Sequence, residues 1–348
     1  MMLQYSTLAA DLDRIRRFLK SGSEEHQTPD QRRFAYIACI SALYSSFENF
    51  AERLAFRFSE MLLADPSNLS TEQMSSLRRR YVRNASALLS QSLGVGRYRE
   101  ITEFDVAKSL ASCLDEATPT FDLRLELIAL HNSNLRWDSL PELFQWAVPD
   151  LQNKIRNSDA VASWSSRTNN VTESTLMGVL KAELDDLVER RNEVAHRAIP
   201  DEIQSYERLL AKVDFIDAIS LGLVASLAGP LLDISIKNGE TVSLGVPTEY
   251  FRSNRVVVIP SLESSVSEGD CIVMPGAKTT RWGRVLEIQL DGNRVRQAHD
   301  GMEVGLHLDF AVRKQANLQL WRTPNSDLAF PPDKLFGNRG PLNNATTE

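Results

Sequence analysis

The chain has 348 residues, of which 43% are hydrophobic and 24% charged, and its formal net charge is −7. This much apolar material can bury a core, so disorder of the whole chain is excluded, and the acidic balance argues against non-specific coating of nucleic acid. Three scattered cysteines without a CxxC pair exclude a zinc knuckle and a disulfide framework. Because the start also lacks a secretory signal, we expect a cytoplasmic protein, and its length favours two domains.

The first 236 residues carry the apolar spacing of three and four that is typical of helices. We expect helices at 5–19, 29–63, from 71 after a capping box formed by Ser70 and Gln73, and near 104–116, 121–131, 139–155 and 174–196. A last helix or a broken pair is expected at 201–232, and a loop at 157–173. The uncharged run Ala218–Leu232 is too short for a bilayer span, so we interpret it as a buried helix or an oligomer contact. No membrane association is expected.

After Asn238-Gly239 the pattern changes to short β-like runs between turn signals. We expect strands at 241–246, 255–259, 270–274, 283–290, 295–297, 303–308 and 318–322, with Asp291-Gly292 as a hairpin turn. So many short strands in so few residues predict a small closed barrel or a sandwich. The predicted fold class is therefore mainly α: a helical domain at 1–236, a small β-barrel at 237–325 and a loose tail at 326–348. Basic and acidic residues balance after residue 236, so the negative charge belongs to the helical part.

Most catalytic templates are absent from the sequence. It contains no phosphate-binding GxxxxGK[ST] loop, no HExxH and no GxSxG, and none of its five histidines has a neighbour at metal-ligand spacing. We therefore expect neither a metal nor a cofactor.

The helix expected at 174–196 carries the most informative cluster. On a helical wheel Arg191 continues an apolar stripe, where a charge is costly without a partner, and Asn192 and His196 are four residues apart on the adjoining edge. An arginine can hold a phosphate through two hydrogen bonds, and a histidine can move protons near neutral pH. This combination suits phosphodiester chemistry that needs no metal.

The segment from Arg191 to His196 resembles the signature of the HEPN superfamily: an Arg, four to six residues and a His, often with Asn directly after the Arg. Arg124 with His131 and Arg294 with His299 also satisfy the bare pattern, but neither has the Asn. Residues 42–50 resemble the first core helix of the stand-alone nuclease branch, with its inward acid, and residues 130–136 resemble its middle segment. The resemblance covers roughly residues 1–230.

The resemblance implies a helical bundle in which two protomers share a cleft, and a metal-independent endoribonuclease that acts as a toxin or in phage defence. It implies that His196 transfers a proton during attack by the RNA 2′-hydroxyl, that Arg191 stabilises the phosphorane, that Asn192 orients the imidazole or binds phosphate, and that Glu48 positions Arg191 or His196. Toxins controlled by a nucleotidyltransferase antitoxin carry a Tyr two residues after the His. Ala198 stands there in this chain, which argues against that regulation.

Purely structural interpretations of the same residues are also consistent with the sequence. His196 at a helix end can be a cap, and Glu48 with Arg53 or Glu52 can be surface charge on a helix. The Arg78–Arg80 run is typical of a solvated face but can gather RNA, so Arg79, Arg80 and Arg190 are candidate RNA contacts. We interpret His131, with Asn132 and Asn134, as a polar cap rather than a second site.

Residues 240–323 are similar to domain two of translational GTPases such as elongation factor Tu, on the runs 267–275, 283–288 and 300–308. This resemblance implies a recognition arm that brings the nuclease to tRNA or other translation-associated RNA; a stabilising or dimer-supporting barrel is equally consistent. We expect an endoribonuclease that works as a homodimer, with a regulatory partner protein as a further candidate. The alternatives are a non-catalytic RNA- or ribosome-binding protein and an antitoxin or scaffold partner on the same fold.

Overall fold

The computed structural model describes residues 1–21, 27–115, 117, 120–131, 133–168, 171–196, 200, 202–276, 279–329, 331–332 and 334–336. The chain forms two compact units. The first comprises residues 1, 3–152 and 172–220, and the second comprises residues 2, 153–171 and 221–348. The division between the two units falls inside the last helix.

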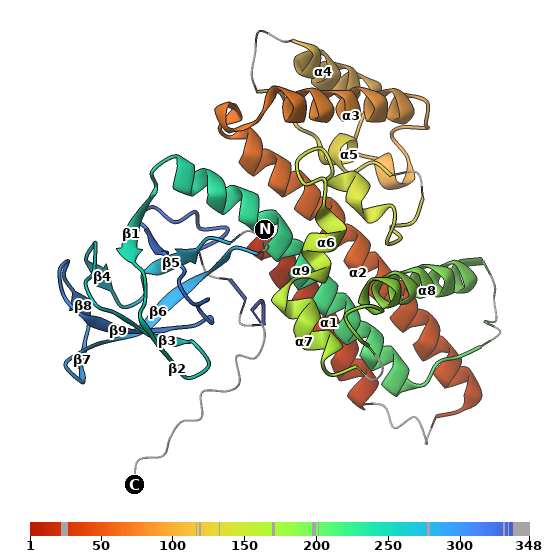
Figure 1. Cartoon of the computed structure of the whole chain (residues 1–348). Helices are drawn as coiled ribbons and strands as arrows, with labels where there is room; N and C mark the ends of the chain where they lie inside the picture. The colour runs from red at the N-terminus through yellow and green to blue at the C-terminus, as the bar shows by residue number, and fades with distance from the viewer. Residues whose placement is uncertain are drawn as a thin grey trace. The chain divides into compact units, whose positions relative to one another are not determined.

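Helices fill most of the chain before residue 238, and strands follow them (Figure 1), which confirms the predicted mainly α fold class. The α-helices of the described residues are α1 (Met2–Ser21), α2 (Pro29–Leu63), α3 (Thr71–Leu89), α4 (Glu103–Leu114), α5 (Leu125–Ile128), α6 (Leu151–Arg156), α7 (Asp159–Ser165), α8 (Leu176–His196) and α9 (Tyr206–Lys237). Between them, within the described residues, lie the short 3₁₀ turns η2 (Pro66–Asn68), η3 (Gly96–Tyr98) and η4 (Leu140–Leu143).

Local capping sets the ends of the long helices. Helix α2 has the predicted bounds. At its start the Thr28 side chain accepts a hydrogen bond from the backbone N–H of Gln31, and the Gln31 side chain accepts one from the backbone N–H of Thr28. Pro29 occupies the first helical turn, where its missing N–H costs nothing. Ser70 and Gln73 form the expected capping box of α3.

Three expectations differ from the structure. The segment 157–173 is not all loop, because Ser158 caps helix α7, which buries Trp164. The helix expected at 121–131 shrinks to the single turn of α5. The helix expected at 139–155 is divided by turns into η4 and α6. At 201–232, where the sequence allows a single helix or a broken pair, α9 continues through Pro230 without a break. A proline inside a helix costs roughly 3 kcal/mol, so burial of the surrounding apolar side chains must outweigh this cost.

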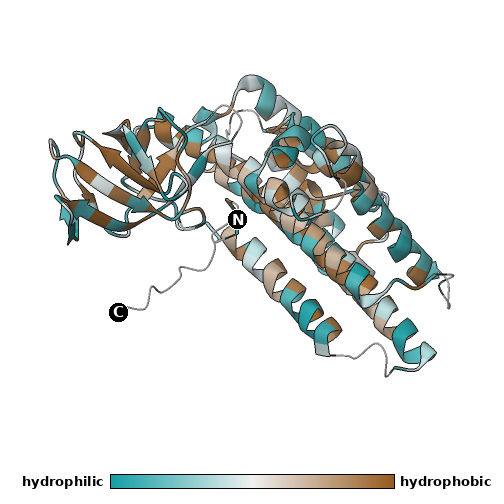
Figure 2. Cartoon of the chain, turned by 60° about the horizontal axis from the view of Figure 1, so that its bottom comes forward, coloured by the Kyte–Doolittle hydropathy of each residue, from teal (hydrophilic) through white to brown (hydrophobic). Residues whose placement is uncertain are grey.

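The core of the first unit lies where α2 packs against α8, and apolar residues run along the length of α2 in Figure 2. Buried residues of α2 include Ile40, Leu43 and Phe47, and those of α8 include Leu180, Leu184, Leu187 and Val188. Hydrophobic burial at this contact fixes which face of α8 is turned inward, and so where the end of α8 is placed.

Buried charges tie α9 to two neighbouring helices. Tyr5 of α1 donates to Asp217 at 2.7 Å, and Arg16 pairs with the same carboxylate at 3.0 Å. Lys212, with a side chain only 1% exposed, contacts the carboxylates of Glu183 and Asp186 on α8. A buried ammonium needs such partners, because its charge would otherwise lie in a low dielectric.

Helix α9 is the one described helix long and apolar enough to cross a membrane, but 89% of its most apolar window is buried inside the protein. This burial is typical of a core helix and confirms the interpretation of Ala218–Leu232 as a buried helix. The same run is therefore not free to serve as a contact between protomers.

The strands form an antiparallel sheet whose hydrogen-bonded order is β1-β10-β5-β6-β9-β3-β2, with β7 paired to β6 and a separate pair β4-β8. Their bounds are β1 (Thr241–Gly245), β2 (Glu249–Phe251), β3 (Val256–Ile259), β4 (Val266–Ser267), β5 (Cys271–Met274), β6 (Arg281–Leu290), β7 (Asn293–Val295), β8 (Gln297–Ala298), β9 (Val304–Leu308) and β10 (Leu318–Trp321). The predicted hairpin at Asp291-Gly292 is confirmed: Leu290 pairs with Asn293, and both turn residues have positive φ, 48° and 77°.

The described part of the expected loose tail packs against the sheet. The indole of Trp282 donates to the carbonyl of Leu328, and the thiol of Cys271 donates to the carbonyl of Ala329 at 3.1 Å. The Phe336 ring lies edge-on to Trp282, with 5.1 Å between ring centroids. Apolar residues among the polar ones decide this packing; residues 337–348 lie outside the described residues.

Candidate active site on helices α2 and α8

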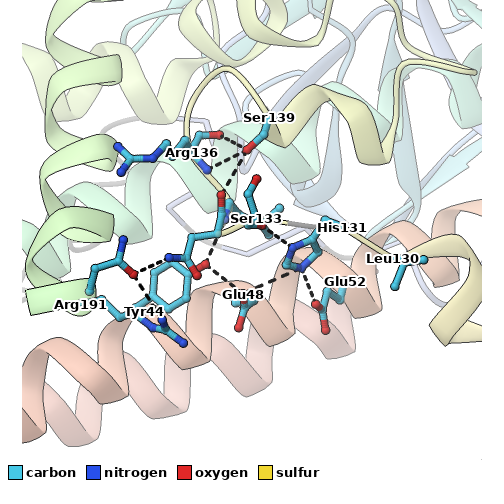
Figure 3. Close-up of polar contacts among 12 residues, drawn as sticks. Tyr44, Glu48, Glu52, Leu130, His131, Ser133, Arg136, Ser139 and Arg191 are labelled. Atoms are coloured by element: carbon cyan, nitrogen blue, oxygen red, sulfur yellow. Dashed lines mark hydrogen bonds and ion pairs between the residues drawn. The ribbon is translucent and has the colours of Figure 1, made fainter. Parts of the chain in front are cut away.

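Arg191 lies near the end of α8, above the ring of Tyr44 on α2 (Figure 3). Its guanidinium carbon is 5.3 Å from the ring centroid, and its Nη1 donates to Oδ1 of Asn192 at 3.3 Å. Asn134 donates to the same amide oxygen at 2.6 Å. Within the described part of the chain, Arg191 forms no ion pair with a carboxylate. An aromatic face and an amide therefore hold its positive charge without neutralising it.

Glu48 joins this arrangement through Tyr44. The Tyr44 hydroxyl donates to Oε1 of Glu48 at 2.8 Å and accepts from the backbone N–H of Leu135 at 2.9 Å. Burial, reinforced by the charge of Glu48, raises the pKa of Tyr44 well above its ordinary value, so the phenol stays protonated and remains a donor. The Glu48 side chain is 22% exposed. It is thus more than a surface charge, while Arg53 bonds elsewhere, to Asn49.

His131 is not the polar cap expected from the sequence. Its Nε2 is 2.7 Å from Glu52 and 3.8 Å from Glu48, and its Nδ1 is 2.6 Å from the carbonyl of Ser133 (Figure 3). Burial by itself lowers the pKa of His131, but the bonds to Glu52 and Ser133 and the two carboxylate charges raise it above its ordinary value overall. The side chain of His131 is 9% exposed, so the fold uses this residue as a largely buried charge partner.

Among the described residues, Glu48, Glu52 and His131 form a group of side chains that could hold a metal ion. One ligand atom each of Glu48, Glu52 and His131 can be chosen so that all lie within 4.8 Å of one another. The sequence did not show this grouping, because His131 is 79 residues away from Glu52.

His196 is the last residue of α8 and is exposed. It lines an open pocket of about 580 Å³ whose other walls are Asp186, Glu189, Arg190, Asn192, Glu193 and Glu202. Asn192 therefore belongs to both places: its amide oxygen contacts Arg191, and its side chain lines the pocket of His196. The lining carries four carboxylates, which makes the pocket of a single chain electronegative.

The three candidate RNA contacts have different surroundings. Arg190 is already engaged, because its Nε lies 3.0 and 3.1 Å from the two oxygens of Asp186 and its Nη1 donates to Tyr36 at 3.2 Å. Arg79 is exposed and lines a cleft of about 1140 Å³ formed by η2, α3 and α4.

Arg80 is buried, with 7% of its surface exposed, and donates to the carbonyls of Ile128, Leu130 and Glu142. A guanidinium enclosed in this way cannot reach a phosphate. Its role is to hold the chain around α5, and its prediction as an RNA contact is corrected on that ground.

Sequence reasoning missed Tyr44, Glu52 and Asn134 as parts of this site. The signal on α2 was the spacing of four between Tyr44, Glu48 and Glu52, which places them on one helix face. The position of Tyr44 in the apolar spacing of the helix expected at 29–63 marks it only as a core residue. Nothing local in the sequence connects Asn134 with Asn192, since that contact depends on how the 130–136 segment crosses the end of α8.

Comparison with known families agrees with this architecture. Residues 6–227 match the RiboL-PSP-HEPN family. The match spans well over half of the chain, and the chain therefore belongs to this HEPN family. No curated protein gave a match to the chain. The family match ends before the sheet, so the similarity of residues 240–323 to domain two of translation factors stays a prediction.

Proposed function

We propose that this protein is a metal-independent endoribonuclease of the HEPN type. Membership of the family supports an RNA-related role. The observation that carries the proposal is the state of Arg191: a positive charge held over Tyr44 and beside Asn192, paired with no described carboxylate, five residues before His196 on the same helix. The neighbouring Arg190, by contrast, is already paired with Asp186.

The chemistry follows from these groups. The imidazole of His196 removes the proton of an RNA 2′-hydroxyl, the 2′-oxygen forms a bond to phosphorus, and the bond from phosphorus to the 5′-oxygen breaks. A protonated acid returns a proton to the leaving 5′-oxygen. The guanidinium of Arg191 stabilises the extra negative charge on the phosphorane, and Tyr44 keeps the guanidinium in place. The products are a 2′,3′-cyclic phosphate and a 5′-hydroxyl.

One chain offers one Arg191 and one His196, whereas the reaction needs both a base and an acid. A homodimer with its two-fold axis at the end of α8 supplies the second pair. It also offers a way to offset the negative lining of the His196 pocket, because a second copy brings another Arg191. Helix α9 is buried in its own chain, so the interface belongs to α8 and its neighbours.

A second candidate function is favoured by one specific observation. Four carboxylates surround His196, and such a surface repels RNA but attracts a basic protein segment. This favours the antitoxin or scaffold alternative, in which the same end of α8 binds a partner protein and cleaves nothing.

The test compares two sites in one chain. Arg294 and His299 repeat the spacing of Arg191 and His196, but Arg294 pairs with Glu268. We expect His196→Ala and Arg191→Ala each to reduce cleavage of a defined RNA about 100-fold or more in excess chelator, and His299→Ala and Arg294→Ala to leave the rate unchanged. The 3′ ends of the products should be cyclic phosphates.

Wild-type rates for His196→Ala would move the active site elsewhere, and cleavage that requires added magnesium would exclude this mechanism. A wild-type protein that cleaves no RNA but captures a basic partner protein would support the scaffold role. For a toxin or defence effector, expression of the wild type should arrest growth, and expression of His196→Ala should not.

A further inference from the structure

The cluster of Glu48, Glu52 and His131 has the composition and the size of a metal site. Two ligands at about 2.1 Å from one zinc ion in tetrahedral geometry lie roughly 3.4 Å apart. The distances from Nε2 of His131 to the two carboxylates, 2.7 and 3.8 Å, bracket that value. One cation between these groups therefore needs side-chain shifts of less than about 1 Å.

The surroundings of the cluster orient the ligands. The bond of Nδ1 of His131 to the carbonyl of Ser133 keeps a proton on Nδ1, so Nε2 is the nitrogen that faces the carboxylates. Without a metal, Nε2 donates its own proton to Glu52; a bound cation displaces that proton, and the lone pair of Nε2 becomes a ligand. The Tyr44 hydroxyl holds Glu48 by a hydrogen bond. A backbone carbonyl behind the imidazole and a phenol behind the carboxylate are the kind of outer contacts that fix metal ligands in place.

We propose that Glu48, Glu52 and His131 bind one divalent transition-metal cation, such as Zn²⁺, and that its binding restrains the active site. The imidazole nitrogen selects a transition metal over Mg²⁺ and Ca²⁺, which prefer oxygen ligands only. Three protein ligands leave room for water on the cation. The net charge of two carboxylates, a neutral imidazole and the cation is zero, which suits side chains that are 9%, 12% and 22% exposed.

The coupling to the active site runs through Glu48 and Tyr44, and it rests on the proposed function. Both the Tyr44 hydroxyl and Nε2 of His131 face the same oxygen of Glu48, so a cation there withdraws charge from the bond to Tyr44. Tyr44 supports Arg191 on its ring face. Weakening its bond to Glu48 loosens the support of Arg191, so cleavage slows when the metal is bound.

The binding test uses the full chain after removal of metals by chelator. Calorimetric titration with ZnCl₂ should give one site per chain, and titration with MgCl₂ at the same concentration should give none. Loss of an outer contact weakens metal affinity about 10- to 100-fold, so Glu52→Gln, which removes a ligand, should weaken zinc binding by about 100-fold or more. The matched control is Glu60→Gln on the same helix, where the carboxylate pairs with Arg57; its affinity should equal that of the wild type.

Competing zinc sites are separated by variants and by spectroscopy. The exposed His196 with its acidic neighbours is the main rival, and His196→Ala should keep wild-type zinc affinity. The three cysteines are buried, so Co²⁺-loaded protein should show visible bands of nitrogen and oxygen ligation without a thiolate charge-transfer band. Unchanged zinc binding by folded Glu52→Gln, or loss of binding in His196→Ala, would overturn the proposal.

The effect on cleavage is a separate measurement. Equimolar Zn²⁺ should slow cleavage by the wild type at least tenfold and leave Glu52→Gln unaffected; equal inhibition of both proteins would overturn the restraining role. If the wild type cleaves no RNA under any condition, the proposed function fails, while calorimetry still decides whether the metal site exists.

Discussion

Replacing Arg80 by methionine tests the reasoning that separates two neighbouring arginines of α3. Arg80 is buried and donates to three carbonyls around α5, whereas Arg79 is exposed. Burial, with a smaller contribution from the charge of Arg83, lowers the pKa of Arg80 to about 10, so it remains charged at neutral pH. Methionine keeps the apolar stem of the side chain as far as the position of Nε but supplies no donor.

The magnitude follows from the three carbonyls. Each buried acceptor left without a partner costs about 1–3 kcal/mol, and the release of a buried charge offsets part of the sum. We expect Arg80→Met to lower the free energy of unfolding by about 3–5 kcal/mol, the lower part of the sum for three unsatisfied acceptors. For a unit of this size the loss corresponds to a fall in Tm of roughly 10 °C.

Urea unfolding followed by circular dichroism measures this loss, with Arg79→Met as the matched control. The control should stay within about 0.5 kcal/mol of the wild type, as exposed substitutions do. A loss below about 1 kcal/mol for Arg80→Met, or equal losses for the two variants, would refute the assignment of Arg80 as a structural residue.

Two further predictions concern α8 and α9. Burial alone would raise the pKa of Asp186, but Lys212 and Arg190 hold this pKa below its usual range. The ionised Asp186 therefore stabilises the folded protein above about pH 4, the pKa of an unfolded Asp. This contribution to the free energy of unfolding is lost as pH falls through the lower folded-state pKa. Urea unfolding between pH 3 and pH 7 should show the stability gap between wild type and Asp186→Asn narrowing as pH falls, and a constant gap would contradict this. A Cβ at Gly222 of α9 would lie 2.7 Å from Oγ of Ser158 and 3.2 Å from Cγ2 of Ile155, whereas one at Gly178 of α8 would meet nothing within 4 Å. Gly222→Ala should therefore lower Tm, while Gly178→Ala should raise stability by about 0.5–1 kcal/mol through its helix propensity; a Tm increase for Gly222→Ala would show that the close contact is absent.

Sequence periodicity and capping predicted the long elements well, because these signals are local. The bounds of α2 follow from Thr28, Pro29 and the apolar stripe, and the hairpin at Asp291-Gly292 follows from two residues that tolerate positive φ. Helix α7 was missed, since only a few apolar residues interrupt its polar segment and its stability depends on burying Trp164. Helix α9 passes Pro230 because tertiary burial outweighs local propensity.

For the candidate site, the sequence by itself determined the end of α8. The order Arg191, Asn192 and His196 on one helix places them within one turn and a half whatever else the chain does, because helix geometry is local. Tertiary structure alone decided the rest. Tyr44 lies under Arg191, and His131 lies between Glu48 and Glu52, because a loop 79 residues beyond Glu52 crosses that face of α2. Arg79 and Arg80 are neighbours of the same residue type, so the local sequence does not distinguish them. The tertiary structure does: on α3 the side chain of Arg79 is exposed to solvent, whereas that of Arg80 is buried against backbone carbonyls.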